Sequence, residues 1–558
     1  MSQTISPEKP HASTASIQKA SPRGWWRAGD SGPESFTKST EKVLGDLSKP
    51  VYVIDINDKQ VFTNFGIAEL GRSAHEDEAE SLIAYAPATR LQDLGDKTFC
   101  QDHGVSLPYM TGAMANGIAS VRLVKAVANA GLLGSFGAAG LMVDQIEEVI
   151  IELKSSLGDK PFCANLIHSP NESGQEKAVV EVYLRHQVHL VEASAYMALT
   201  LPVVRYRVHG IHRDQQGNII TPNNIIAKAS RIEVAQRWFS PAPVKFLQTL
   251  LEAGEITAEQ AELAAQVPMA QDLSVEADSG GHTDNRPAIT LIPTIVALRD
   301  RLQREYGYSK QLRVGAAGGI ATPASAAAAF SMGAAYIVTG TINQACIESG
   351  SSDLARQMLA DAKQADVAMA PAVDMFEMGV KLQVLKRGTM FAMRGNKLYE
   401  LYRNYDAIED IPSVELASLE KSIFKASVEE IWQNSRSFFL ERDAEQVEKA
   451  EKDPKHKMAL MFRWYLGLSS RWANAGIAER QMDYQIWCGP AMGAFNEWVK
   501  DSLLEAPANR NVVSVALNIL YGAALVTRMN MLSLQGAVIA SLDRDIRPQA
   551  LEKIEYTL

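Results

Sequence analysis

Between about residues 105 and 340, short apolar segments alternate with longer segments in which apolar residues recur at helical spacing. Strands separated by helices in this way form right-handed βαβ units and a parallel sheet. The pattern therefore predicts an α/β protein. The predicted strands are 107–111, 132–136, 162–166, 189–193, 203–208, 225–229, 273–277, 314–317 and 336–339.

The last two predicted strands each run directly into a glycine turn. Gly318-Gly319 follows the strand at 314–317, and Gly340-Thr341 follows the strand at 336–339. Glycine lets the backbone approach a bulky anion closely, and the start of a helix directs free N–H groups toward it. A TIM barrel binds phosphate with two such turns, after its strands 7 and 8. We therefore predict a TIM (β/α)8 barrel over residues 104–352 that holds a phosphorylated cofactor or substrate.

Three further regions are predicted around this barrel. Residues 1–48 lack periodicity, which indicates a mobile or loosely ordered tail. In 49–103, two strand patterns flank the turn at residues 57–60, so we expect a small β-containing element with a hairpin. Residues 353–558 are mostly helical in pattern and form a separate helical C-terminal region.

An insertion interrupts the barrel pattern at residues 241–269. It contains two helical runs, and Thr257 with Gln260 resembles a capping box at the start of the second run. A helical hairpin here would serve as a lid over the barrel mouth. An insertion without a role at the site, or a dimer contact, is an equally good interpretation.

Composition excludes several classes of protein. The net charge of −10 argues against nucleic-acid binding, which needs clustered Lys and Arg. The polar N-terminus predicts no signal peptide, and the apolar helix at 512–526 is shorter than the roughly 20 residues that span a bilayer. We expect it to be a core helix and predict no membrane role. The scattered cysteines predict no disulfide framework and no metal site, and they suit a cytoplasmic location. They are Cys100, Cys163, Cys346 and Cys488.

A second motif, Asp278-Ser279-Gly280-Gly281-His282, follows the predicted strand at 273–277. A histidine after a glycine pair at the carboxyl end of a barrel strand lies at the barrel mouth. Its imidazole can donate a proton near neutral pH. The alternative is a histidine that only caps a helix or bonds a backbone carbonyl. The position one β/α unit before the glycine turns favours the active-site interpretation for His282.

These motifs resemble the nitronate monooxygenase family, which includes flavin-dependent bacterial enoyl reductases. The resemblance rests on PYMTGAMANGIASVRLVKAVANAGLLGSFGAAG, FCANLI, VEADSGGH and RVGAAGGIATPASAAAAFSMGAAYIVTGT. The family usually has E-A-G-G-H where this chain has D-S-G-G-H. Asp278 and Ser279 therefore depart from the pattern, which leaves the role of Asp278 open.

The chain as a whole resembles a narrower group, the PfaD family of trans-acting enoyl reductase subunits. These subunits serve bacterial polyunsaturated-fatty-acid synthases, and relatives serve polyketide synthases. The resemblance covers about residues 50–540 and includes the C-terminal stretch MAPAVDMFEMGVKLQVLKRGTMFAMRGNKLYELY.

The resemblance implies an FMN site with no metal. It places the backbone of Ala113 and Met114 against the isoalloxazine ring and the Asn165 amide at the polar edge of the ring. Lys228 would place positive charge near the ring and so stabilise reduced flavin, although a lysine extending to solvent is an equally good account. The implied cofactor residues are Ala113, Met114, Asn165, Lys228, Gly280, Gly281, Gly318, Gly319, Gly340 and Thr341.

The resemblance also implies a mechanism and partners. NAD(P)H would reduce the flavin, hydride would pass to the β-carbon of a trans-2-enoyl thioester, and His282 or solvent would protonate the α-carbon. The expected partners are the acyl carrier protein domains of a polyunsaturated fatty acid synthase, and a homodimer is expected. An acidic carrier protein needs local positive charge on an acidic enzyme. Two basic stretches, 205–213 and 381–397, could supply it, although solvated faces or internal ion pairs are the better interpretation of each.

Three other functions remain open from the sequence. A nitronate oxidase would use FMN without a nicotinamide donor. A scaffold subunit of the synthase would retain flavin without catalysis. A barrel that binds a phosphorylated metabolite would contain no flavin at all.

Overall fold

In the computed structural model, the described residues are 23–29, 39–71, 79–168 and 173–555. They form two compact units. The smaller unit comprises Met1–Thr89 with Leu525–Asp545, and the larger unit comprises Arg90–Ala524 with Ile546–Leu558.

The smaller unit contains a five-stranded antiparallel sheet in the order β3-β2-β5-β1-β4. Asn57 and Asp58 connect β2 to β3 with positive φ angles of 53° and 63°, as a two-residue hairpin requires. This confirms the predicted hairpin. The elements are β1 (Gly24–Arg27), α1 (Thr40–Gly45), β2 (Val51–Ile56), β3 (Lys59–Thr63), β4 (Ile67–Leu70) and β5 (Glu80–Ala86).

The prediction of a loosely ordered tail over 1–48 is wrong at two places. Strand β1 pairs with both β4 and β5, and the side chain of Trp26 on β1 is buried in the core of this sheet. Helix α1 also lies in this range. A strand of four residues has too few positions to show periodicity, so the pattern did not reveal it. Residues 1–22 and 30–38 lie outside the described part of the chain.

The apolar helix near the C-terminus is α20 (Val512–Leu534), which is longer than the predicted 512–526. Among the described residues it is the one helix long and apolar enough to cross a membrane, and 83% of its most apolar window is buried. That burial agrees with the predicted core helix. Within the smaller unit, the buried Arg528 of α20 donates hydrogen bonds to the backbone carbonyls of Leu44, Asp46, Leu47, Lys49 and Pro87.

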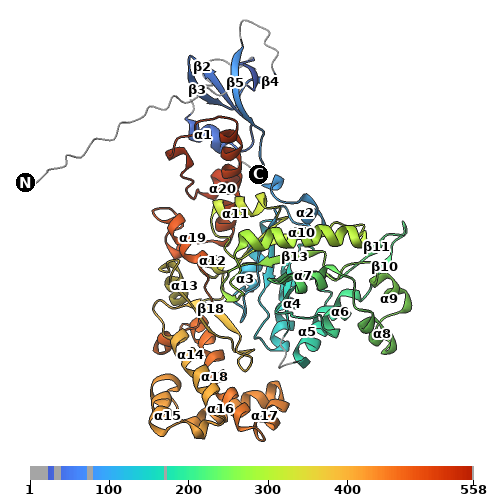
Figure 1. Cartoon of the computed structure of the whole chain (residues 1–558), viewed down its shortest axis with the longest axis vertical. Helices are drawn as coiled ribbons and strands as arrows, with labels where there is room; N and C mark the ends of the chain where they lie inside the picture. The colour runs from blue at the N-terminus through green and yellow to red at the C-terminus, as the bar shows by residue number, and fades with distance from the viewer. Residues whose placement is uncertain (1–22, 30–38, 72–78, 169–172, 556–558) are drawn as a thin grey trace, which may run out of the picture. The chain divides into compact units, whose positions relative to one another are not determined.

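The larger unit is built on a closed barrel of eight parallel strands, which confirms the predicted TIM barrel (Figure 1). The glycine turns follow β15 and β16, which are the seventh and eighth barrel strands in chain order. The barrel strands are β6 (Tyr109–Thr111), β7 (Leu133–Phe136), β8 (Cys163–Ile167), β9 (Leu190–Ser194), β12 (Asn224–Ala229), β13 (Asp272–Glu276), β15 (Arg313–Ala317) and β16 (Ile337–Thr339).

The ninth predicted strand, 203–208, is wrong because these residues belong to helix α6. The Thr200 hydroxyl accepts a hydrogen bond from the Val203 N–H, and Pro202 lies in the first turn. A side-chain cap and an early proline both favour helix initiation. They outweigh the β-branched residues that suggested a strand.

A helix follows each barrel strand along the chain, as in other (β/α)8 barrels. These helices are α3 (Val121–Asn129), α4 (Val143–Leu157), α5 (Ser173–Arg185), α6 (Leu201–Val208), α7 (Ile232–Phe239), α10 (Ala288–Tyr306), α11 (Pro323–Ser331) and α12 (Thr341–Gln344). A small hairpin of β10 (His212–Arg213) and β11 (Ile219–Ile220) follows α6.

Helix α2 (Lys97–His103) closes the end of the barrel where the strands begin. The ring of Phe99 stacks on Tyr336 with 4.1 Å between ring centroids, inside the barrel core. Arg313, the first residue of β15, is buried and binds Asp272 at 2.6 Å and Asp102 at 2.6 Å. The barrel is therefore filled at this end, and a ligand can enter only from the other.

The insertion forms the predicted helical hairpin, α8 (Val244–Glu252) and α9 (Ala258–Ala264), with the predicted capping box at Thr257 and Gln260. It lies between α7 and β13, and therefore at the end of the barrel where strands begin. Both helices contact α6, and Glu255 forms an ion pair with Arg205. The interpretation as a lid over the barrel mouth is therefore wrong.

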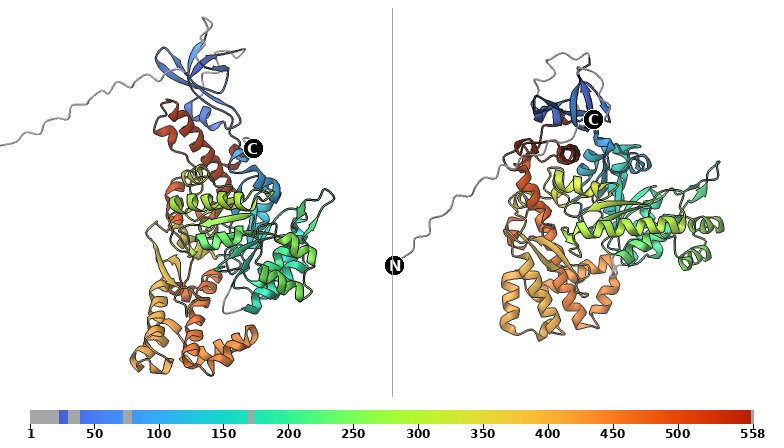
Figure 2. Two further views of the ribbon diagram at one scale, coloured as in Figure 1. Left: turned by 45° about the vertical axis from the view of Figure 1, so that its right-hand side comes forward. Right: turned by 45° about the horizontal axis from the view of Figure 1, so that its top comes forward.

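Residues 353–558 are largely helical, as predicted, and Figure 2 shows the orange helices of this region grouped beside the barrel. The helices here, besides α20, are α13 (Asp353–Ala360), α14 (Phe391–Asn404), α15 (Ser413–Leu419), α16 (Val428–Arg442), α17 (Ala444–Ala450), α18 (Pro454–Ala475), α19 (Ala491–Val499) and α21 (Leu551–Glu555). The chain also contains short 3-10 or π helices. One, η2 (Leu91–Asp93), precedes the barrel, and the others lie in the C-terminal region: η3 (Ile408–Asp410), η4 (Glu420–Phe424), η5 (Ala478–Asp483), η6 (Pro507–Asn509) and η7 (Leu542–Arg544).

Two strands in this region were not predicted, β17 (Val367–Pro371) and β18 (Lys381–Leu385). They form a three-stranded antiparallel sheet with β14 (Gly281–His282), in the order β14-β18-β17. The prediction that strands end near residue 353 is therefore incomplete. The missing strands pair with the histidine motif of the barrel, about a hundred residues earlier in the chain.

Candidate active site

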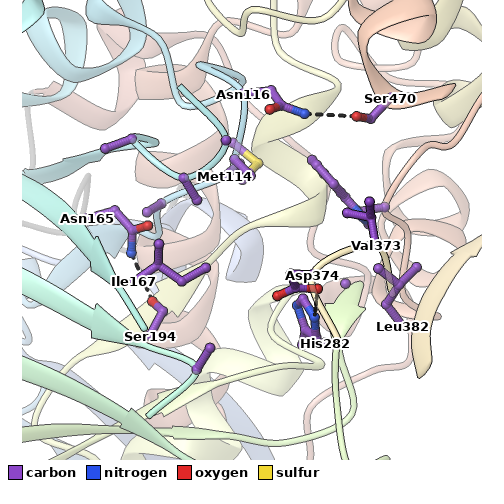
Figure 3. A pocket seen from close by; sticks show the side chains of 18 of the residues that line it. Met114, Asn116, Asn165, Ile167, Ser194, His282, Val373, Asp374, Leu382 and Ser470 are labelled. Carbon is purple, nitrogen blue, oxygen red and sulfur yellow. Dashed lines mark hydrogen bonds and ion pairs between the residues drawn. The ribbon is translucent and has the colours of Figure 1, made fainter. Parts of the chain in front are cut away.

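A cavity of about 480 Å³ lies at the carboxyl ends of the barrel strands. Figure 3 shows Met114 and Asn165 of the barrel on one side of it, and Val373 and Leu382 of the C-terminal region on the other. All eleven residues predicted for the site line this one cavity. They are Ala113, Met114, Asn165, Lys228, Gly280, Gly281, His282, Gly318, Gly319, Gly340 and Thr341.

The glycine turns after β15 and β16 leave room and hydrogen-bond donors for an anion. Gly318 and Gly319 have φ angles of 79° and 76°, which only glycine adopts without strain. A Cβ atom on Gly319 or Gly340 would meet no atom within 4 Å. In the described part of the chain, the backbone N–H groups of Gly319, Gly340 and Thr341 donate no hydrogen bond to the protein. Free N–H groups around open space are what a phosphate site requires.

The histidine of the DSGGH motif is paired with an acid from the C-terminal region. His282 Nε2 lies 3.0 Å from Asp374 Oδ1, and both residues line the cavity (Figure 3). Burial lowers the pKa of His282, but the charge and hydrogen bond of Asp374, together with the charge of Glu276, outweigh this effect and raise the pKa above its ordinary value. The carboxylate therefore favours the protonated form of the imidazole.

Strand β18 fixes the loop that precedes His282. The Gln383 amide Nε2 donates to Asp278 Oδ1 and to the Ser279 carbonyl, both at 2.8 Å. Asn285 Nδ2 donates to the same Asp278 oxygen at 2.9 Å. The role of Asp278, which the sequence left open, is therefore to hold this loop in place. Sequence analysis gave no signal for Gln383.

Gly280 makes a close backbone contact besides lining the cavity. A Cβ atom here would lie 2.8 Å from the Cys488 nitrogen and 2.9 Å from the Thr341 hydroxyl oxygen. A Cβ atom on Gly489 would lie 2.7 Å from the Gly280 nitrogen. The two glycines thus allow the segment around 488–489 to pack against the motif. Gly489 N–H also donates to the Thr341 hydroxyl at 3.4 Å.

Lys228 lies between two carboxylates. Its ammonium group is 2.9 Å from Glu276 and 3.8 Å from Glu192, and Glu192 is fully buried. The alternative in which Lys228 extends to solvent is therefore wrong. That Lys228 places positive charge beside a flavin ring stays a prediction, and the two carboxylates beside the ammonium group would offset that charge. Neither glutamate was predicted, since each occupies an ordinary strand position with no local motif.

Asn165 uses one end of its amide within the protein. Its Nδ2 donates to the Glu192 carbonyl at 3.0 Å and to Ser194 Oγ at 2.9 Å (Figure 3). Both amide hydrogens are therefore used within the protein, and Oδ1 is the atom left to contact a ligand. The Ala113 N–H is likewise used, in a 2.7 Å bond to Glu192.

The C-terminal region completes the cavity wall. Asn116 Nδ2, in the loop after β6, donates to Ser470 Oγ of α18 at 2.8 Å (Figure 3). Residues of α16 and α18 line the side of the cavity that faces the barrel loops. The predicted separate helical region is thus part of the site.

The two predicted basic stretches are mostly engaged inside the protein. In 205–213, Arg205 pairs with Glu181 at 2.8 Å, and the buried Arg207 donates to the Pro268 and Asn223 carbonyls. In 381–397, Arg394 pairs with the buried Asp483, and Lys397 pairs with Glu415 at 2.7 Å. Lys381 and Lys386 are exposed. Ion pairs and hydrogen bonds within the protein therefore engage most of these cations, and the exposed lysines fit a solvated face.

Comparison with known proteins agrees with this geometry. The sequence model described as "Nitronate monooxygenase" matches residues 102–397, which is more than half of the chain and includes every barrel strand. The chain belongs to the nitronate monooxygenase family. A second model, the inserted helical domain of acyl-carrier-protein S-malonyltransferase, matches residues 405–484. This range covers α15 to α18 and therefore includes much of the cavity wall opposite the barrel.

Similar proteins place the chain in the PfaD-like branch of this family. It is 51% identical over 465 residues to a polyunsaturated fatty acid synthase subunit of Thraustochytrium sp., covering 82% of this chain and 31% of that protein. It is 44% identical over 463 residues to the polyketide biosynthesis protein PksE of Bacillus subtilis, covering 83% of this chain and 60% of that protein. The chain thus spans about a third of the first relative and under two thirds of the second.

A solved structure is also similar over most of the chain. It is the enoyl reductase domain of MlnA from the macrolactin biosynthesis cluster of Bacillus amyloliquefaciens, with 37% identity and a TM-score of 0.76. The alignment covers 79% of this chain and 99% of that domain. The similarity therefore extends beyond the barrel into the C-terminal region.

Proposed function

We propose that this chain is an FMN-dependent enoyl reductase that reduces trans-2-enoyl thioesters with NAD(P)H during polyunsaturated fatty acid or polyketide synthesis. The observation on which this rests is the His282–Asp374 pair, which faces the same cavity as the glycine turns. A proton donor and an anion cradle in one enclosed cavity suit reduction of a substrate beside a phosphorylated cofactor. The similarity to an enoyl reductase domain supports the proposal.

The residues present fit FMN. The open space at Gly319 and Gly340, with the free N–H groups of Gly319, Gly340 and Thr341, suits the phosphate. Ser279 lines the same cavity, and its buried hydroxyl has no hydrogen-bond partner, so it would be a further donor to the phosphate. Met114, Asn165 and Lys228 would contact the ring. When bound, FMN would supply hydride-transfer chemistry.

His282 is the proposed proton donor of the reaction. Reduction of an enoyl thioester adds a hydride to the β-carbon and a proton to the α-carbon. The Asp374 carboxylate orients the imidazole and raises its pKa, which favours the protonated form that can act as the donor. Asp374 would then stabilise the pair until solvent returns a proton to His282.

The Lys228, Glu276 and Glu192 cluster would orient the ring edge and the loop after β6. Glu192 accepts the Ala113 N–H at 2.7 Å and lies beside Lys228, so it connects the ring environment to that loop. The ammonium group stays charged because the two carboxylates raise its pKa, against the effect of burial.

The proposed partners are the acyl carrier protein domains of a synthase. The relatives named as synthase and polyketide biosynthesis proteins support this, as does the match of 405–484 to a domain of an acyl-carrier-protein transferase. We also propose a homodimer, which light scattering would test, and a cytoplasmic location, which the four free cysteines suit.

The family match makes nitronate oxidation the second candidate function. One comparison separates the two. Purified protein with FMN should oxidise one NADPH for each crotonyl thioester reduced under anaerobic conditions. Rapid oxygen uptake on a nitronate, without thioester reduction, would replace the proposal with the second candidate. A protein active in neither assay would be a scaffold.

A further inference from the structure

Helices α16 and α18 form a cationic wall of the cavity. The only charged side chains that they place on it, in the described part of the chain, are Arg442, Arg463 and Arg471. The aromatic rings of Phe438, Phe439 and Trp464 lie on the same wall. None of these residues has a role in the proton donation or the phosphate cradle described above.

Arg463 is buried without enough hydrogen-bond partners. Its exposed fraction is 6%, and both Nε and Nη1 lack a partner. Its guanidinium lies 5.6 Å from the centre of the Phe439 ring. A buried guanidinium with free N–H groups is costly unless a ligand supplies acceptors, so this wall is built to receive oxygen atoms.

Arg471 lies two helical turns further along α18, about 12 Å along the helix axis. Its side chain is exposed, and its Nη2 donates only a long bond of 3.4 Å to the Gly140 carbonyl. The guanidinium groups of Arg471 and Arg442 both lie 5.8 Å from the centre of the Phe438 ring. Burial and the charge of Arg442 lower the pKa of Arg471, so these two cations interact at this end of the wall.

The acids of the cavity are bound to other groups. Glu276 pairs with Lys228, Asp374 with His282, and Glu176 with His168 and Tyr196. Among the described residues, neither Arg463 nor Arg471 lies within ion-pair distance of a carboxylate, although the charge of Arg463 contributes to lowering the pKa of Asp374 and of Glu377. The wall thus keeps excess positive charge in an enclosed, partly aromatic space, which attracts an anion.

We propose that this wall binds the phosphate-bearing pantetheine arm of the thioester substrate. Arg471, beside Arg442, contacts the phosphate ester, and Arg463, deeper in the cavity, donates to a carbonyl oxygen of the arm. This placement of the two arginines matches the structure of the arm, because the thioester must reach His282 while the phosphate lies at the opposite end of the arm. Guanidinium is the side chain best suited to phosphate and to buried carbonyl oxygens. The inference rests on the proposed function for the identity of the substrate.

Binding without turnover tests this site separately from the reaction. We would titrate the FMN-loaded protein with 4′-phosphopantetheine and with pantetheine in a calorimeter. The wild-type protein should bind the phosphorylated compound at least tenfold more tightly. Arg471→Gln should remove that preference. Arg463→Gln should weaken the binding of both compounds by the same factor. Arg436→Gln is the matched control, because Arg436 is a half-buried arginine of α16 that pairs with Glu451 and does not line the cavity.

Several results would overturn the proposal. Equal affinity of the wild-type protein for the two compounds would do so, as would an Arg471→Gln variant that keeps the preference. If Arg471→Gln instead raises the KM for NADPH and leaves that for NADH unchanged, the phosphate belongs to the nucleotide. Because Arg471 is exposed, its variant tests the site even if Arg463→Gln does not fold. A protein that binds phosphopantetheine but reduces no thioester would disprove the proposed function and leave the site intact.

Discussion

His282 and Asp374 lie 92 positions apart in the chain, yet their side chains meet at 3.0 Å. The contact exists because His282, on β14, pairs with Leu382 of β18, and Asp374 lies in the connection that leads from β17 to β18. The acid–base pair is therefore assembled from the barrel and from the C-terminal region. Neither part alone contains it.

Removing each member of this pair should affect the reaction differently. His282→Ala should lower the kcat for crotonyl thioester reduction by roughly 10²- to 10⁴-fold, because the positioned proton donor is lost. Asp374→Asn should cause a smaller loss, since the imidazole remains. Steady-state kinetics and the flavin absorbance of each purified variant would measure both effects. FMN content that falls in parallel with kcat would instead make His282 a flavin ligand.

The pH dependence of kcat provides a second test. The pKa of His282 is raised in the folded protein, so the donor is protonated below that pKa, and kcat should fall as the pH rises through it. In Asp374→Asn the carboxylate that raises the pKa is absent, while burial still lowers it. The decline should therefore begin at a lower pH than in the wild type. Identical pH profiles of the two proteins would show that Asp374 does not act on this proton.

The phosphate cradle can be tested at one glycine. Gly319→Ala would place a Cβ atom in the open space between the turns and should weaken FMN binding at least tenfold. Gly333→Ala is a matched control, because Gly333 also has a positive φ angle, 93°, and open space around it, but it lies outside the cavity. Both variants carry the same backbone cost of about 1 kcal/mol. Reconstitution of the apoprotein with FMN would measure the affinities, and equal weakening in both variants would exclude the cradle.

The closed end of the barrel should determine stability and not catalysis. Arg313→Leu would leave the buried Asp272 with His103 as its one remaining ion-pair partner among the described residues and should lower the free energy of unfolding by about 3–5 kcal/mol. Lys310→Ala removes an exposed partner of Asp102 and should cost less than about 1 kcal/mol. Denaturant unfolding would measure both changes. Similar losses in the two variants would contradict the importance of the buried pair.

Sequence patterns predicted the barrel because its main signals are local. Each barrel strand is a short apolar run, and the glycine turns at 318–319 and 340 need no distant partner to be recognised. The same local reasoning identified His282 and the cradle residues, which the structure brings to one cavity. Local signals can also mislead, as at 203–208, where a cap and a proline produced a helix instead of the predicted strand.

The residues that the sequence did not reveal depend on distant pairing. Asp374 and Gln383 matter only because β18 lies against the DSGGH motif, and that pairing joins segments about a hundred residues apart. The net charge around Lys228 likewise required the side-chain positions of Glu192 and Glu276 on neighbouring strands. Such contacts between separate elements are set by tertiary packing and leave no periodic pattern.

The most direct test of the central claim is the visible spectrum of the purified protein with FMN during an anaerobic reaction cycle. We predict that NADPH bleaches the flavin absorbance and that one equivalent of crotonyl thioester then restores it without oxygen. A protein that binds no FMN, or a bleached flavin that only oxygen restores, would contradict the proposed reduction.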